Sequence, residues 1–161
     1  MTEHWVFNAS PLILLGKAGQ LEWLPRLGSV IIPSAVVAEI QAGSLDDPAR
    51  RFVEALNQAE WTLREVTAKK DVLAWDLGPG ETAVISWAID NSDHEAVLDD
   101  AAARRCGDVF GIRLRGTLSL VALAKKRGWV AACRPVFARL LDAGLFVSPI
   151  LVDQVAESVG E

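Results

Sequence analysis

Tyrosine is absent from the 161-residue sequence, and cysteine and histidine each occur only twice. The spacing of Cys106 and Cys133 matches no zinc-binding pattern. The first residues lack the basic and then apolar pattern of a signal peptide, and no apolar run approaches the length of a membrane span. We therefore expect a cytoplasmic protein whose two thiols are reduced.

An excess of positive charge is also missing, because the formal net charge is -5. The chain as a whole is therefore not built to attract nucleic acid by charge alone. The charge is uneven: residues 1–100 carry 7 basic and 16 acidic side chains, whereas residues 101–161 carry 9 and 5. An acidic metal pocket beside a basic phosphate-binding rim would give this asymmetry, but on charge alone ordinary surface variation is the favoured explanation.

Apolar residues make up 51% of the sequence, and six tryptophans and five phenylalanines supply bulky core material. This composition is typical of a globular protein, and the length suits one domain over residues 1–161. Short apolar or alternating segments predict strands at 5–7, 30–32, 61–66, 96–98 and 112–114. Caps and periodicity predict helices at 12–18, 20–24, 35–41, 49–59, 81–90, 101–106, 117–127, 135–143 and from about 150.

Strands alternate with helices along the chain, which predicts an α/β fold with a parallel sheet covered on both faces. Ligands bind such sheets outside the carboxyl ends of the strands. Asn8 and the pair Asp99 and Asp100 follow predicted strands, and Glu81 begins a helix after a glycine-rich break. Glu39 lies on an otherwise apolar helix with no Lys or Arg within a turn.

Taken singly, most of these residues have a structural explanation. Asn8 suits a turn, Glu81 complements the positive end of its helix, and one of the two aspartates is expected to be an N-cap. Glu39 is harder to explain, because a charge at the edge of a buried face needs a partner. Together the acids predict a Mg²⁺ or Mn²⁺ site, since hard cations prefer carboxylate oxygen and can promote phosphodiester cleavage.

Candidate substrate contacts lie near the same edge of the sheet. Ser10 and Thr117 are candidates for hydroxyl contacts to water or phosphate, although helix capping is the commoner role. Arg115 precedes a Gly-Thr turn and is the preferred candidate for an RNA backbone contact. Arg104, Arg105 and Arg113 are further candidates of this kind.

Five segments, in order, resemble those of PIN-domain proteins: 6–13, 30–40, 77–85, 97–104 and 116–128. The last of them resembles a helix in an uncharacterised PIN-like branch. The resemblance implies a three-layer α/β/α sandwich and a Mg²⁺- or Mn²⁺-dependent endoribonuclease. Many bacterial members resemble VapC, the toxin of a toxin–antitoxin pair, which a small antitoxin holds inactive, and homodimers are common.

The resemblance also implies that Glu39, Glu81, Asp99 and Asp100 are metal ligands or acids just behind them. The first acid of the family is usually Asp, but here that position is Asn8. An amide offers a carbonyl oxygen without a negative charge, so metal affinity should fall, although Asn8 can still orient a water.

Three hypotheses follow from these patterns. The leading one is a metal-dependent ribonuclease of toxin type. The second is a PIN-like protein with weakened or lost catalysis that acts as a binding or regulatory partner, as Asn8 suggests. The third is a flavodoxin-like or nucleotide-binding module, which would need a glycine-rich phosphate loop after the first strand. That turn instead contains Pro11, which removes a backbone N–H from it.

Overall fold

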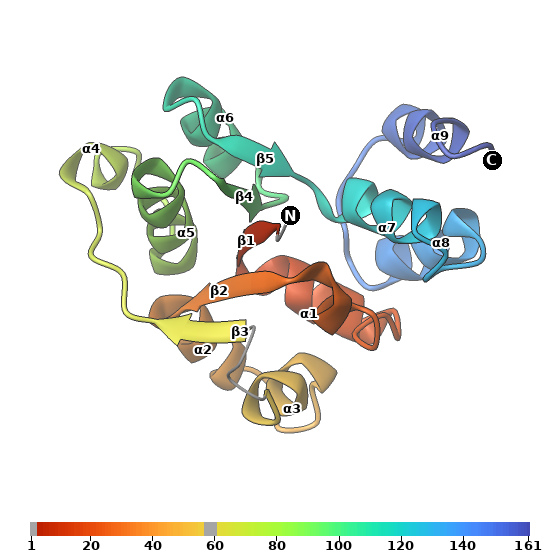
Figure 1. Cartoon of the computed structure of the whole chain (residues 1–161), viewed down its shortest axis with the longest axis horizontal. Coiled ribbons are helices and arrows are strands. Elements are labelled where there is room, and N and C mark those ends of the chain that lie inside the picture. The colour runs from red at the N-terminus through yellow and green to blue at the C-terminus, as the bar shows by residue number, and fades with distance from the viewer. Residues whose placement is uncertain (1–2, 57–60) are drawn as a thin grey trace.

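Five parallel strands form one sheet at the centre of the computed structural model, which describes residues 3–56 and 61–161 (Figure 1). The strands are β1 (His4–Phe7), β2 (Ser29–Pro33), β3 (Trp61–Arg64), β4 (His94–Val97) and β5 (Arg113–Arg115). Their order in the sheet is β3-β2-β1-β4-β5, and every neighbouring pair is parallel. The predicted parallel α/β fold is therefore confirmed.

Helices cover both faces of the sheet, with α5 and α6 on one side and α1 and α7 on the other (Figure 1). Nowhere in residues 3–56 and 61–161 does a helix have both the length and the apolar composition that a bilayer crossing demands. The helices are α1 (Ala9–Lys17), α2 (Ser34–Gln41), α3 (Pro48–Glu54), α4 (Lys70–Leu73), α5 (Pro79–Asp90), α6 (Ala101–Val109), α7 (Thr117–Lys126), α8 (Cys133–Asp142) and α9 (Pro149–Glu157), with a 3₁₀ helix, η1, at Leu24–Leu27.

The central strand is apolar because it is buried on both faces. Trp5, Val6 and Phe7 in β1 are each at most 2% exposed. The Phe7 ring lies 5.6 Å from that of Trp61, and the Phe52 ring meets Trp61 edge-on at 5.2 Å. Aromatic pairs at such distances stabilise a core beyond their buried area. These contacts pack the side chains of β1, β3 and α3 against one another.

Several element boundaries differ from the prediction. Helix α1 begins at Ala9, so its N-cap is Asn8, and Ser10 and Pro11 lie in its first turn. Pro11 is tolerated there because the first four N–H groups of a helix have no intrahelical partner. No helix forms at 20–23, where one was predicted; the 3₁₀ helix η1 begins at Leu24 and has Pro25 as its second residue. The helix predicted for 49–59 ends at Glu54, and residues 57–60 lie outside the described part of the chain.

The start of α8 is capped by a side chain distant in sequence. The Glu161 carboxylate accepts hydrogen bonds from the backbone N–H groups of Cys133 (2.6 Å) and Arg134 (3.1 Å). It also accepts a 2.6 Å hydrogen bond from Lys125 Nζ. These hydrogen bonds lower the pKa of Glu161 from 4.5 to about 2. The bond from Lys125 has the largest effect, followed by the two backbone bonds.

We expect this cap to make stability depend on pH. A lowered pKa in the folded state means that the Glu161 carboxylate stabilises the fold above pH 4.5 and loses this effect as the pH falls towards 2. Glu161→Gln should therefore lower the melting temperature most at pH 7, and the difference from the parent should narrow below pH 4.5. Thermal melts from pH 7 to pH 3 test this, with Glu157→Gln on exposed α9 surface as control. A difference that stays constant across this range would contradict the assignment.

Candidate active site

The reversal of strand order places Asn8 at the carboxyl end of β1, beside the end of β4. In the order β3-β2-β1-β4-β5, the connections run outward in opposite directions from β1 and β4. Ligands bind open parallel sheets at such a switch point. The Asn8 backbone N–H donates to Val97 O at 3.2 Å, so the two strands stay paired up to this point. The Asn8 side chain is 1% exposed.

The two ends of the Asn8 amide have different environments. Its Nδ2 donates to Glu81 Oε1 at 3.3 Å, which explains why Asn8 makes no side-chain cap bond to α1. Its Oδ1 is buried and has no hydrogen-bond partner among the described residues. A buried polar atom without a partner costs free energy, and native proteins seldom leave one unpaired. Oδ1 is therefore free to accept a hydrogen bond or to bind a cation.

Glycines bring the start of α5 close to these oxygens. Gly78 is the N-cap of α5, Pro79 is its first residue, and Glu81 lies in its first turn. A Cβ on Gly80 would lie 2.8 Å from Glu39 Oε2 and 3.0 Å from Asn8 Oδ1. A side chain here would force the Glu39 carboxylate to move and would crowd Asn8 Oδ1, so Gly80 allows the two oxygens to lie against the helix backbone. The glycine-rich break predicted before residue 81 is thus the beginning of the helix.

Glu39 reaches this point from α2. The residue is largely exposed, but its carboxylate end lies beside Gly80 and Asn8. Burial of the carboxylate, and next the negative charge of Glu81, raise the pKa of Glu39 above its usual value of 4.5. Two carboxylates and an unpartnered amide oxygen therefore lie close together, and among the described residues neither carboxylate forms an ion pair. A cation relieves the repulsion in such an arrangement.

The two aspartates after β4 each cap a different helix. Asp100 is the N-cap of α6, and its Oδ2 accepts from Ala103 N at 2.9 Å, as expected for one of the pair. Asp99 Oδ1 accepts from Thr117 N at 2.9 Å, and its Oδ2 accepts from the Thr117 hydroxyl. Asp99 thereby replaces the missing cap of α7, whose own N-cap is Gly116. Each carboxylate keeps lone pairs for a further contact.

One cavity of about 400 Å³ joins most of the predicted site residues. It lies at the carboxyl ends of β1 and β4, between the starts of α1, α5 and α6 and the segment after α8. Its polar wall comprises Asn8, Ser10, Glu81, Asp99 and Asp100. Glu39 does not line this cavity but lies behind it, against Gly80. The apolar wall comprises Leu14, Ala101, Leu145 and Phe146, together with Gly144.

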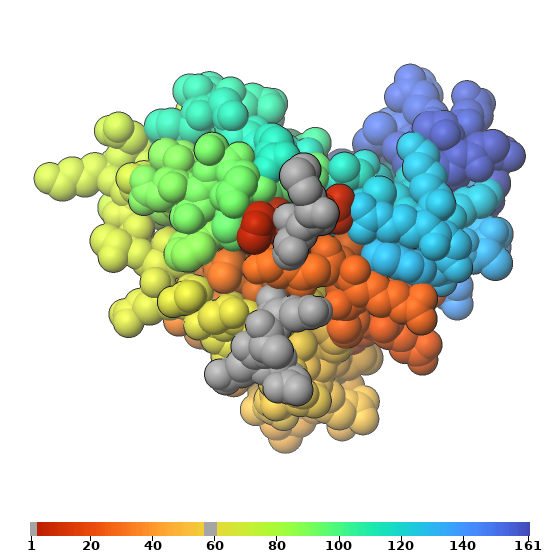
Figure 2. Space-filling view, in the orientation of Figure 1, coloured from red at the N-terminus to blue at the C-terminus, as the bar shows by residue number. Residues whose placement is uncertain are grey.

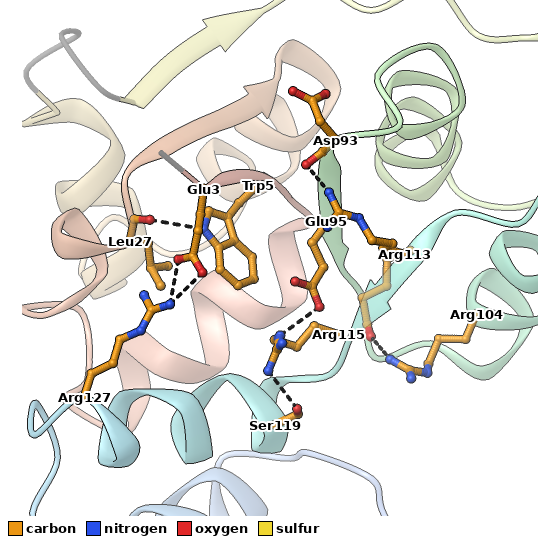
Figure 3. Close-up of polar contacts among 11 residues, drawn as sticks. Glu3, Trp5, Leu27, Asp93, Glu95, Arg104, Arg113, Arg115, Ser119 and Arg127 are labelled. Carbon is orange, nitrogen blue, oxygen red and sulfur yellow. Dashed lines mark hydrogen bonds and ion pairs between the residues drawn. The ribbon is translucent and has the colours of Figure 1, made fainter. Parts of the chain in front are cut away.

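The structure does not bring Thr117 or Arg115 to this cavity. Thr117 is fully buried and its hydroxyl supports Asp99, so it orients an acid and cannot touch a substrate. Arg115 Nε donates to Glu95 Oε1 at 2.9 Å, and its Nη1 donates to Ser119 Oγ at 3.2 Å (Figure 3). The guanidinium also lies 5.6 Å from the Trp5 ring centre. Arg115 is thus held on the α7 side of the sheet by three partners.

The side chains present fit a hard divalent cation in their chemistry, although they are not drawn together to coordination distance. The donor set contains only oxygen, includes the unpartnered Asn8 Oδ1, and carries excess negative charge. Within residues 3–56 and 61–161, however, no three Asp, Glu, His or Cys side chains are close enough together to hold a metal ion. Asn8, Glu39 and Glu81 are the residues that would hold such an ion, with Asp99 and Asp100 across the cavity.

The fold and this site define a class of protein: a three-layer α/β/α sandwich with an acidic cavity at the switch point of its sheet. The PIN-domain family DUF3368 matches residues 4–161, so the chain belongs to the PIN-domain family. Members of this family are generally nucleases that depend on divalent metal ions and bind nucleic acid. The resemblance noted in the sequence is therefore confirmed at the level of the family.

Among solved structures, the chain is similar to a PilT N-terminus domain protein from the hyperthermophilic archaeon Sulfolobus solfataricus P2. The two share 16% sequence identity, with a TM-score of 0.49, over 75% of this chain and 92% of the other. A comparison with curated proteins found no match.

Proposed function

We propose that this chain is a Mg²⁺- or Mn²⁺-dependent endoribonuclease of PIN type. The observation that carries the proposal is the buried Asn8 Oδ1, which lacks a partner and lies beside Glu39 while its amide nitrogen binds Glu81. Most buried polar atoms in native proteins are paired, so an unpartnered oxygen in a side chain that is 1% exposed calls for an explanation. An oxygen left bare among carboxylates favours a cation site.

The proposed roles follow from what each side chain contacts. Glu39 and Glu81 supply negative charge on either side of Asn8, whose amide donor fixes the Glu81 carboxylate. Asp99 and Asp100 face the same cavity from the end of β4, each anchored by a backbone N–H at the start of a helix. These anchors hold the two acids in place before any substrate arrives, which is the preorganisation that catalysis of charge-developing reactions requires.

When bound, a divalent ion supplies an activated water and positive charge for the developing negative charge on a phosphodiester. The chain itself has two tasks. It holds together acids whose negative charges repel one another, as the raised pKa of Glu39 indicates. It also places acids in a cavity that a strand of RNA can enter. Ser10, which is exposed on the cavity wall, is positioned to contact the substrate phosphate.

The finer biological assignment is also a proposal. We infer that the chain is a single PIN-like domain over residues 1–161 and acts in the cytoplasm as the toxin of a toxin–antitoxin pair. It would form a homodimer and be neutralised by a small antitoxin protein. A small reading frame beside its gene whose product relieves growth arrest would support this assignment.

A catalytically weakened PIN-like protein that binds or regulates a partner is the second candidate. It is favoured by Asn8, which brings no negative charge to the position where the family usually has an acid. The lack of three metal-binding side chains at close range, within the described residues, also favours it. In that case the acidic cavity would bind a partner without cleaving it.

Two measurements with the purified chain separate these candidates. The nuclease proposal predicts cleavage of a single-stranded RNA in the presence of millimolar Mn²⁺ or Mg²⁺, and no cleavage in EDTA. Calorimetry with Mn²⁺ should show binding to the same preparation. Absence of both binding and cleavage would reject the nuclease and favour the regulatory candidate.

A further inference from the structure

A second cavity, of about 170 Å³, lies next to the acidic one, between α6, the start of α7 and α9. The surface is hollowed between the segments of α6 and α9 (Figure 2). Its polar end is formed by Asp99 and Arg104, beside Gly116 and Ser119. Its remaining wall is apolar and comprises Leu118, Val147, Leu151 and Val155.

The two cavities adjoin. Asp99 lines both of them, and the consecutive residues Phe146 and Val147 line one each. The Phe146 side chain, which lines the acidic cavity, is completely exposed, with a relative accessibility of 101%. An exposed aromatic ring of this kind offers a flat apolar surface to whatever passes from one cavity to the other. A ligand in the acidic cavity can therefore extend into the apolar one.

Arg104 is the cation at this junction. Its Nη1 donates to Leu98 O at 2.9 Å, which holds the guanidinium at the end of β4 (Figure 3). In the described part of the chain, no carboxylate forms an ion pair with Arg104. A half-buried guanidinium with free N–H groups is a good partner for a phosphate, because it can donate two parallel hydrogen bonds.

Neighbouring arginines are already bound to acceptors within the chain. Arg113 donates to the Asp93 carbonyl, Arg115 is paired with Glu95, and Arg127 donates to both oxygens of Glu3 (Figure 3). Arg105, next to Arg104 on α6, is exposed and lines neither cavity. The position of Arg104 thus distinguishes it from the other arginines of this region.

We propose that the apolar cavity is a nucleotide subsite for single-stranded RNA. It would hold the base of the nucleotide next to the cleaved phosphodiester, while Arg104 binds that nucleotide's phosphate. This proposal rests on the proposed ribonuclease function. The volume is below the roughly 300–1,000 Å³ of sites that hold a whole small molecule, so the cavity suits one group of an extended ligand.

Charge favours an RNA strand over an apolar segment of a protein as the occupant. An apolar protein segment would cover Arg104 without offering an acceptor to the free N–H groups of its guanidinium, which is costly. A nucleotide satisfies both parts of the site, because its base has apolar faces and its phosphate is anionic. An RNA strand continues on either side of the phosphodiester that is cut. It can therefore occupy both cavities, which share Asp99 as a wall.

The phosphate contact is tested by RNA binding in EDTA, where no cleavage is expected. Arg104→Gln should weaken binding of a short fluorescent single-stranded RNA by about 10-fold, as for loss of a charged hydrogen bond. It should also reduce the slope of log K against log salt by about 0.7, the value for one phosphate on a single strand. Arg104→Lys should restore the slope and part of the affinity. Arg139→Gln, at an exposed arginine of α8 that lines neither cavity, should behave like the parent. Equal binding by Arg104→Gln and the parent would overturn the proposal.

The base contact is tested with RNAs that carry one abasic nucleotide at successive positions. One position should bind the parent markedly more weakly than intact RNA does, and Leu151→Gln should remove this difference. Leu141→Gln is the matched control, because Leu141 and Leu151 have similar exposure (39% and 42%) but Leu141 lines neither cavity. An abasic penalty that is unchanged in Leu151→Gln would overturn the assignment of the cavity.

The same preparations show whether the subsite or the enzyme proposal is at fault. If the parent cleaves RNA with Mn²⁺ while both tests fail, the nuclease stands and the subsite is rejected. The same binding results together with absent Mn²⁺-dependent cleavage would reject both. If this face binds a protein partner and not RNA, Arg104→Gln should bind RNA as tightly as the parent does. That result also rejects the subsite.

Discussion

Glu81→Gln is expected to abolish Mn²⁺-dependent RNA cleavage, lowering kcat/KM by at least ~100-fold. Charge stabilisation by a catalytic metal contributes several kcal/mol, and each loss of about 1.4 kcal/mol is tenfold in rate. The substitution is nearly isosteric, and the amide oxygen of glutamine can still accept the hydrogen bond from Asn8 Nδ2. The fold should therefore be kept while the negative charge is lost.

Two further measurements make this result specific. Glu65→Gln, at an exposed glutamate that lines neither cavity, should cleave like the parent. In Glu81→Gln the pKa of Glu39 should fall towards its usual value, because the charge of Glu81 is one of the two causes that raise it. An NMR titration of Glu39 detects this shift without any assay of activity. Cleavage by Glu81→Gln at the parent's rate would show that Glu81 is not part of the site.

Asn8→Asp should destabilise the metal-free protein and strengthen its response to Mn²⁺. The new carboxylate would be almost fully buried beside Glu39 and Glu81, and the donor to Glu81 would be lost. An uncompensated buried charge costs on the order of 3 kcal/mol. In a protein of this size that lowers the melting temperature by roughly 6–12 °C. Thermal melts in EDTA provide the measurement.

Mn²⁺ should then reverse the effect. A ligand that binds only the folded state stabilises it by an amount that grows as its dissociation constant falls. Because a third acid raises the affinity for a cation, Mn²⁺ should raise the melting temperature of Asn8→Asp more than that of the parent. Asn91→Asp, at the end of α5, makes the same chemical change away from the cavity and should respond like the parent. Equal Mn²⁺ responses of Asn8→Asp and the parent would place the cation elsewhere.

The residues that follow strands were the most predictable part of the site. Asn8, Asp99 and Asp100 come directly after apolar segments, and the carboxyl ends of parallel strands meet at one edge. Glu81 was predictable from its place in the first turn of a helix that follows a glycine-rich break. Their meeting in one cavity agrees with that prediction, whereas their role as metal ligands or catalytic acids stays a prediction.

The substrate contacts were much less predictable. Thr117 and Arg115 lie beside the Gly-Thr turn as expected, but packing directs the first to Asp99 and the second to Glu95 and Ser119. Ser10 was expected to cap α1, yet the helix begins one residue before it, and its exposed side chain lines the cavity. The contribution of Phe146 to the cavity wall had no signal in the sequence, because it depends on how the segment after α8 packs.

Local sequence was sufficient for the order of the strands, for most helices and for the parallel sheet, because apolar alternation, caps and prolines act over a few residues. It did not predict α4. It was also sufficient for the departure at Asn8, which is visible as a residue type. The environment of each side chain depended on contacts between segments far apart in the chain, such as Gly80 with Glu39 and Asp99 with Thr117. Hydrogen-bond partners, burial and the shared wall of the two cavities arise from that packing, and no local pattern encodes them.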